Sequence, residues 1–220
     1  MKILFYKTLL AATAAAVVSL PAVAVNTHKT VANNQPDAVY VAHLSALNTT
    51  VTGQAATGEA RFTIKGDRLT ISVHAQGVSP NIMHWQHLHG FSDARSAACP
   101  TSAADVNGDG IIDLMETVPM AEMTMVSLHD DPVSMDIPRD TYPKASAKGT
   151  LQYRKTVSLS ALQDAFAKAF AGQKLDLDRR VLMMHGVPSA TKLPASVASL
   201  GTIPAQVTLP IACGKITRLK

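Results

Sequence analysis

Three histidines within six residues are the part of this sequence best suited to do chemistry. His84, His87 and His89 stand in the segment His-Trp-Gln-His-Leu-His, in a chain that has eight histidines. Side chains of a strand alternate between its two faces, so His87 and His89 would project side by side and Leu88 to the other face. Neutral imidazole nitrogens are good ligands for copper and zinc. The segment therefore predicts half of a metal site; the alternative is a polar strand with unrelated histidines.

A second metal-binding pattern covers residues 105–116. This twelve-residue segment has the oxygen-bearing residues, the glycine at the sixth position and the closing glutamate of an EF-hand calcium loop. The predicted ligands are Asp105, Asn107, Asp109, the backbone carbonyl of Ile111, Asp113 and Glu116. Pro100 and Pro119 flank the loop closely, which favours a single calcium loop with a structural role over a paired helix–loop–helix. The alternative is an acidic surface turn.

The first 24 residues have the pattern of a secretory signal peptide. Lys2 and Lys7 provide a positive start, and residues 8–20 form an apolar run. Ala22-Val23-Ala24 is a typical cleavage site, and the run is too short for a membrane span. We therefore expect a secreted or periplasmic protein that is cleaved near Ala24 and has no membrane span.

The mature chain is expected to be one domain. Residues 25–38 are polar without periodicity and predict a flexible N-terminus, which leaves residues 39–220 for the domain. Loss of two lysines with the signal peptide lowers the formal charge from +4 to +2, which gives no reason to expect a nucleic-acid partner. Cys99 and Cys213 are the two cysteines, and in an oxidising compartment two cysteines most often pair; two buried thiols are the alternative.

Short segments of alternating polarity, separated by turn residues, predict the fold. Strands are expected over residues 39–45, 57–64, 68–76, 84–89, 118–128, 149–159, 179–186 and 209–219. Lys65-Gly66-Asp67 should join the second and third of them in a hairpin. One helix is expected over residues 160–171, with Ser160 and Gln163 as a capping box and an apolar face that packs on the strands. The pattern is typical of an all-β sandwich or barrel.

Other soft or basic ligands stand near these patterns. Met120, Met123 and Met125 lie in the expected strand over residues 118–128, where thioethers could bind Cu(I), although a core role is more common for methionine. His129 follows in a turn, where it could be an extra ligand or be solvated.

In five ordered stretches the chain resembles the copper/zinc superoxide dismutase family. These are the hairpin at residues 57–77, the His84-x-x-His87-x-His89 strand, the Cys-Pro-Thr-Ser-Ala loop at Cys99, the strand over residues 180–186 that ends in His185-Gly, and the last strand around Cys213. The resemblance implies a Greek-key β-barrel, a copper ion bound by His87, His89 and His185, a Cys99–Cys213 disulfide, and superoxide as substrate. We expect His84 to lie beside the copper ligands and to support them without binding the ion.

Departures from the family pattern matter for function. Asp105 stands where the family has its bridging histidine, and Pro210 stands where it has the arginine that guides superoxide. The zinc loop has no counterpart, and the helix over residues 160–171 is an addition. These differences argue against a zinc site and against fast superoxide turnover, because the cation that attracts the anion is missing. The calcium loop takes the place of the zinc loop.

Three functions follow from these patterns. The first is a superoxide dismutase-like copper enzyme, in which Asp105 could be a fourth ligand. The second is a non-catalytic copper-binding protein for storage or delivery. The third is a calcium-stabilised β-sandwich that serves as a binding module.

Overall fold

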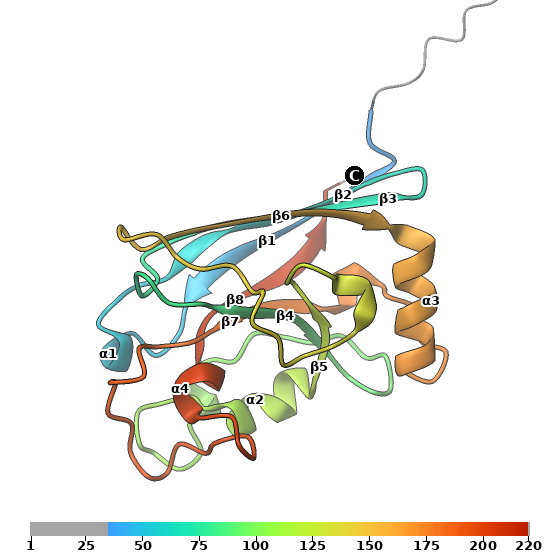
Figure 1. The fold of residues 1–220 in the computed structure, drawn as a ribbon. Coiled ribbons are helices and arrows are strands. Elements are labelled where there is room, and N and C mark those ends of the chain that lie inside the picture. The colour runs from blue at the N-terminus through green and yellow to red at the C-terminus, as the bar shows by residue number, and fades with distance from the viewer. Residues whose placement is uncertain (1–34, 220) are drawn as a thin grey trace, which may run out of the picture. The chain divides into compact units, whose positions relative to one another are not determined.

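Eight antiparallel strands form the centre of the computed structural model, which describes residues 35–219. The strands are β1 (Ala38–Ala46), β2 (Thr57–Lys65), β3 (Arg68–Gln76), β4 (Trp85–Gly90), β5 (Met123–Ser127), β6 (Thr150–Ser158), β7 (Val181–His185) and β8 (Pro210–Arg218). Their order in the sheet is β5-β4-β7-β8-β1-β2-β3-β6. The sheet curls so that β1, β2, β3 and β6 form one layer and β8, β7, β4 and β5 the other (Figure 1). The predicted all-β architecture of the barrel type is confirmed. The predicted signal peptide lies outside the described residues.

The sequence alternation fixes which side chains fill the space between the two layers. β2 and β3 pair in register from Thr57 opposite Gln76 to Lys65 opposite Arg68, and Gly66 closes the hairpin with φ 54°. This is the predicted hairpin. The core contains fully buried side chains from both layers, among them Phe62, Leu69, Ile71, Leu88, Leu182 and Ile216.

Helix α2 (Leu114–Ala121) corrects the strand expected over residues 118–128. Asp113 is the N-cap: its side chain accepts from the Glu116 amide, and the Glu116 side chain accepts from the Asp113 amide. This capping box starts a helix that continues through Pro119, and only Met123–Ser127 remains as strand β5. Glu116, the last residue of the acidic loop at residues 105–116, is thus also the third residue of α2.

The predicted helix is present as α3 (Leu159–Ala169), with a different cap from the expected one. Ser158 is the N-cap, because its hydroxyl accepts from the Ala161 amide, whereas the Ser160 amide donates to Asp67. Leu162 and Phe166 are fully buried in the core, so the helix packs on the sheet as expected. Two single-turn helices, α1 (Thr49–Thr52) and α4 (Ala205–Thr208), complete the set, and none of the described helices is long and apolar enough to cross a bilayer.

A disulfide ties the loop after β4 to the last strand. Cys99 and Cys213 are bonded with an S–S distance of 2.00 Å, across a sequence separation of 114 residues. Cys213 is buried with Phe91, Val181 and Met183 in a second apolar cluster, outside the main core.

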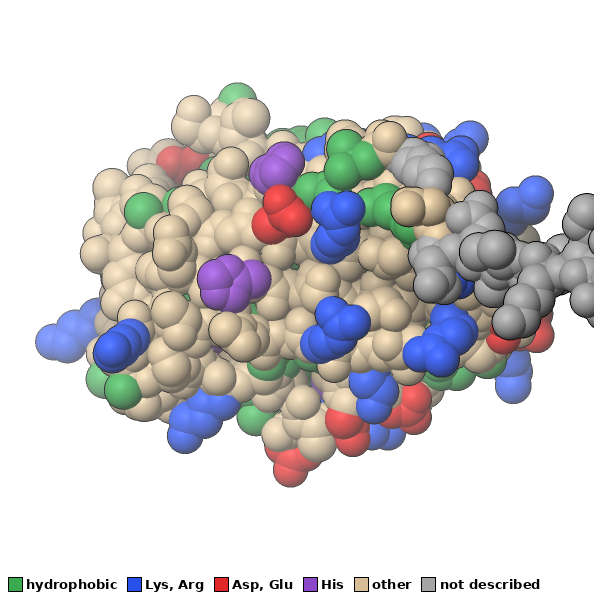
Figure 2. Space-filling view, turned by 90° about the horizontal axis from the view of Figure 1, so that it is seen from above, with side chains coloured by type: hydrophobic (Ala, Val, Ile, Leu, Met, Phe, Trp, Pro, Cys, Tyr) green, Lys and Arg blue, Asp and Glu red, His purple; other side chains and the backbone are tan. Residues whose placement is uncertain are grey.

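The outer face of the layer formed by β1, β2, β3 and β6 is polar. Basic side chains are spread among polar and acidic ones over this face of the sheet (Figure 2).

Candidate metal site

Two strands bring His87, His89 and His185 together. Each offers one ring nitrogen to a cluster in which these atoms all lie within 4.8 Å of one another. β4 pairs with β7, and the register places Trp85 opposite His185 and His87 opposite Met183. The register is irregular between Leu88 and His89, where β4 pairs with β5, and between Met184 and His185, where β7 pairs with β8. Ring centroids are 5.3 to 5.8 Å apart, so three imidazoles from two distant segments face one point.

The three rings are buried, and ring nitrogens inside the cluster have no hydrogen-bond partner. The exposed fractions are 3% for His87, 1% for His89 and 2% for His185. The unpartnered atoms are Nδ1 of His87, both ring nitrogens of His89 and Nε2 of His185. The other nitrogen of His185, Nδ1, lies 2.8 Å from the carbonyl oxygen of Thr208. A carbonyl can only accept, so Nδ1 carries the proton and Nε2 presents a lone pair to the cluster.

Burial keeps these imidazoles neutral. Desolvation is the largest cause of a lowered pKa at each ring, and the charge of neighbouring His185 adds to it at His87 and His89. The pKa of His89 falls to about 3 and that of His185 to about 4, while the pKa of His87 lies well below its ordinary value. The site therefore offers uncharged lone pairs at neutral pH, which is the form that binds transition metals.

The lowered pKa values predict an acid-sensitive metal-free protein. The unfolded chain takes up a proton at each of these histidines near pH 6.5, whereas the folded protein does so near pH 4 at His185 and pH 3 at His89. Stability should therefore fall as pH drops below about 6.5, by about 1.4 kcal/mol per pH unit for each histidine. Denaturant unfolding of His185→Gln should show a shallower pH dependence than wild type. The exposed-site variant His74→Gln should retain the wild-type slope, and an equal slope in all three proteins would contradict the assignment.

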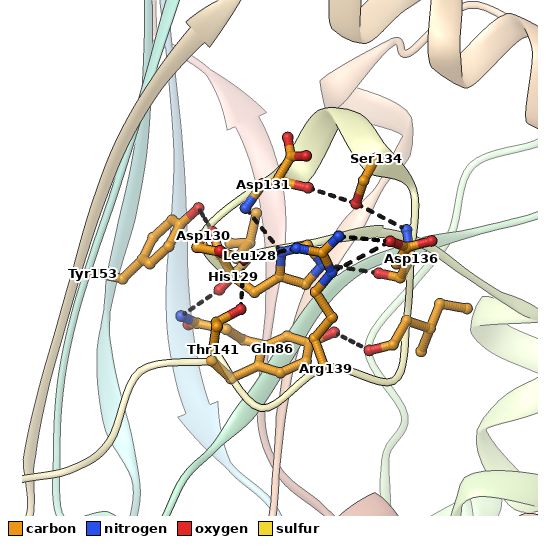
Figure 3. Close-up of polar contacts among 12 residues, drawn as sticks. Gln86, Leu128, His129, Asp130, Asp131, Ser134, Asp136, Arg139, Thr141 and Tyr153 are labelled. Carbon is orange, nitrogen blue, oxygen red and sulfur yellow. Dashed lines mark hydrogen bonds and ion pairs between the residues drawn. The ribbon is translucent and has the colours of Figure 1, made fainter.

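His84 and His129 lie beside the cluster without joining it. The ring nitrogens of His84 lie 3.1 Å from the carbonyl oxygen of His185 and 2.9 Å from that of Ser79, so the residue before β4 contacts the backbone at the end of β7 and at Ser79. His129 is fully buried: its Nδ1 accepts from the Asp131 amide and its Nε2 lies 2.9 Å from the Asp136 carbonyl (Figure 3). It is neither solvated nor free to bind a metal in this arrangement.

Other sequence candidates lie elsewhere. Both carboxylate oxygens of Asp105 accept backbone amides of its own loop, and this residue is not part of the three-histidine cluster. Of the three methionines considered as Cu(I) ligands, Met125 packs in the main core, Met123 packs against this core, and Met120 lies on helix α2. The structure therefore assigns Met123 and Met125 to packing.

Aromatic and aliphatic side chains enclose the cluster. A small cavity of about 20 Å³ borders it, with Trp85, Leu114, Ile137 and Leu200 in its wall together with His87 and His185. Tyr142 covers His87, and its ring is 4% exposed. A volume of this size holds about one water molecule. None of the side chains that line this cavity carries a positive charge.

The acidic loop at residues 105–116 lies beside this enclosure and is connected to its walls. Its side-chain oxygens accept backbone amides within the loop, and Gly108 and Gly110 take the left-handed conformation at φ 74° and 82°. Asp113 also accepts from the Ala198 amide, and Ser196 donates to Asp109. The loop is followed directly by α2, whose first residue, Leu114, lines the cavity.

The chain is thus a curled antiparallel sheet of the β-barrel type with a buried three-histidine cluster that could hold a metal ion. No family model matches the sequence, and no curated protein matches it. Among solved structures, the chain is similar to Cu/Zn superoxide dismutase from Brucella abortus, with 17% sequence identity and a TM-score of 0.42; the match covers 81% of this chain and 99% of that chain.

Tyr142, Trp85 and Thr208 are site residues that sequence reasoning missed. Trp85 was within the histidine segment, but nothing in its spacing indicates that it stacks on Tyr142, with ring centroids 5.3 Å apart. Thr208 acts through a backbone carbonyl, which carries no sequence signal. Tyr142 comes from a loop 55 residues after His87.

Proposed function

We propose that this chain is a copper-binding protein that holds one ion through His87, His89 and His185. One observation supports this most: each of the three buried histidines offers a ring nitrogen without a hydrogen-bond partner to a cluster in which these atoms lie within 4.8 Å of one another. A buried polar atom without a partner costs about 1–3 kcal/mol, so the cluster is unfavourable unless something binds there. A metal ion would accept one lone pair from each of the three rings.

The donor set favours copper over the other common ions. Three neutral imidazoles suit copper and zinc, whereas calcium and magnesium require oxygen ligands. For the same nitrogen ligands, Cu²⁺ binds more tightly than Zn²⁺. Bound copper would supply one-electron chemistry between its Cu(I) and Cu(II) states.

The enclosure favours holding copper over rapid superoxide turnover. A cavity of about 20 Å³ and a wall of Trp85, Ile137 and Leu200 restrict access to the cluster. Attraction of a small anion needs a cation near the entrance, and the cavity wall has none. Storage or delivery of copper is therefore the function that we propose, and dismutation is the alternative to be measured.

Metal titration and a superoxide assay test this proposal. Metal-free protein should bind one Cu ion per chain and retain it in the presence of equimolar zinc. Copper-loaded wild type should accelerate superoxide decay no more than copper-loaded His87→Ala. Fast decay that depends on His87 would replace storage with dismutation, and absence of stoichiometric copper binding would reject a copper function.

We also propose that residues 105–116 bind calcium. The spacing of oxygen ligands supports this, and so does the placement of Glu116, which is buried and directed back at the amides of Val106 and Asn107. The loop is hydrogen-bonded to the segment that contains Ser196 and Ala198. A calcium ion in the loop would therefore stabilise two parts of the cavity wall, at Leu114 and at Leu200.

Calcium removal should lower the melting temperature of the metal-free protein. At a calcium concentration about 100 times the dissociation constant, binding contributes about 2.7 kcal/mol, which corresponds to a shift of about 5–10 °C in a domain of this size. EDTA should remove this increment, and calcium without copper should restore it. Asp105→Asn, which keeps an oxygen for the loop amides, should abolish the shift, while Asp164→Asn at an exposed position of α3 should retain it. A calcium shift that persists in Asp105→Asn would contradict the predicted loop.

A location outside the cytoplasm agrees with the Cys99–Cys213 bond. Disulfides persist in oxidising compartments and are rare in reducing ones. The signal peptide and its cleavage near Ala24 remain a prediction, which N-terminal sequencing of the mature protein can test.

A further inference from the structure

The Tyr142 hydroxyl lies between a histidine ring and a backbone carbonyl. Its oxygen is 2.8 Å from Nε2 of His87 and 2.7 Å from the carbonyl oxygen of Ile137. A phenol has a single proton, and a carbonyl oxygen can only accept a hydrogen bond. Both contacts are satisfied only if Tyr142 donates to Ile137 and His87 donates its Nε2–H to Tyr142.

This arrangement determines which nitrogen of His87 is available to a metal. With the proton on Nε2, the lone pair of the neutral ring is on Nδ1, the atom that is buried without a partner in the cluster. His185 has the opposite arrangement, because the Thr208 carbonyl holds the proton on Nδ1 and leaves Nε2 free. The two strands thus present different ring nitrogens to the same point.

The loop that carries Tyr142 is held in place on both sides of the residue. Arg139 contacts Asp130 and Asp136, and Thr141 donates to Asp130 (Figure 3). On the other side, the His84 amide donates to the carbonyl of Pro143 at 3.1 Å. The Tyr142 ring also stacks on Trp85, with an interplanar angle of 20°. The hydroxyl therefore has a fixed position relative to the ring of His87.

We propose that Tyr142 is a positioning residue for the three-histidine site: it holds the His87 proton on Nε2 so that Nδ1 is the metal ligand. This inference rests on the proposed copper function for its purpose, but the tautomer itself is a property of the metal-free protein. Without the hydroxyl, the buried Nε2–H has no acceptor, so the preference for the Nε2–H tautomer is lost and the proton can reside on Nδ1. Metal binding must then displace that proton from the ligand atom.

The tautomer can be measured directly in metal-free protein by two-bond ¹H–¹⁵N correlation spectroscopy of the imidazoles. Wild type should show the Nε2–H pattern at His87 and the Nδ1–H pattern at His185. Tyr142→Phe should lose the Nε2–H pattern at His87 only. Tyr153→Phe is the matched control, since the Tyr153 hydroxyl donates to the His129 carbonyl at 2.9 Å and is not among the partners of His87. An Nδ1–H pattern at His87 in wild type would overturn the proposal whether or not the variants fold.

Copper affinity provides the second readout. Loss of a residue that orients a metal ligand typically weakens binding about 10–100-fold, so Tyr142→Phe should fall in this range and Tyr153→Phe should match wild type. Equal copper affinity in wild type and Tyr142→Phe would reject a role for Tyr142 in metal binding. If wild type itself binds no copper while His87 shows the Nε2–H pattern, the copper function fails and the tautomer assignment stands.

Discussion

Replacement of His185 with glutamine is expected to weaken copper binding by more than about 100-fold. The remaining ligands, His87 and His89, come from one strand and give only two nitrogens, whereas the ring of His185 closes the site from β7. Even a residue that only supports a ligand contributes about 10–100-fold to affinity, so a ligand itself should contribute more. Competition with a Cu(I) chelator of known affinity measures the effect.

The control for this variant is His74→Gln. His74 lies on the exposed face of β3, opposite Glu59 and Gln152 in the neighbouring strands, and has no contact with the cluster. It should bind copper as wild type does. If His185→Gln binds copper as tightly as His74→Gln, the ion is bound elsewhere on the chain and the three-histidine site is wrong.

Removal of the disulfide is expected to cause the largest loss of stability. The Cys99–Cys213 bond closes a loop of 114 residues, and the chain-entropy model gives about 4–5 kcal/mol for a loop of this length. The double variant Cys99→Ser, Cys213→Ser should therefore melt about 10–20 °C below wild type. Calorimetry of both proteins under non-reducing conditions measures this difference.

Reduction of the wild-type protein provides an independent check on the disulfide. Added reductant should lower the melting temperature of wild type toward that of the double variant and should leave the variant unchanged. Cys213 packs with Phe91 and Met183, and Met183 lies opposite His87 in the pairing of β4 with β7. Reduction of the disulfide should therefore also lower the copper affinity. A double variant that melts with wild type would show that the bond does not contribute to the folded state.

The parts of the fold that were predictable are those in which local pattern and tertiary environment agree. Alternation predicted the β2–β3 hairpin because each strand has one buried face, and Lys65-Gly66-Asp67 supplies the turn. The apolar spacing of α3 likewise predicted a helix with Leu162 and Phe166 against the core. The strand expected over residues 118–128 was wrong at its start, because the Asp113–Glu116 capping box was interpreted only as calcium ligands.

The candidate site was predictable only in part, for a geometric reason. Strand periodicity places His87 and His89 on one face, since they are two residues apart. No local rule connects either of them to His185, and only the family resemblance suggested that ligand. The enclosure was not predictable at all: Tyr142 and Ile137 act from a loop whose conformation depends on buried His129 and on the Arg139 ion pairs.

X-ray absorption spectroscopy of the copper-loaded protein tests the central claim most directly. The multiple-scattering pattern of imidazole gives the number of histidine ligands on the bound ion. We predict one copper per chain with three histidine ligands in wild type, and two in His185→Gln under conditions that saturate the variant. A wild-type spectrum dominated by oxygen ligands, or one that His185→Gln leaves unchanged, would contradict a copper site formed by His87, His89 and His185.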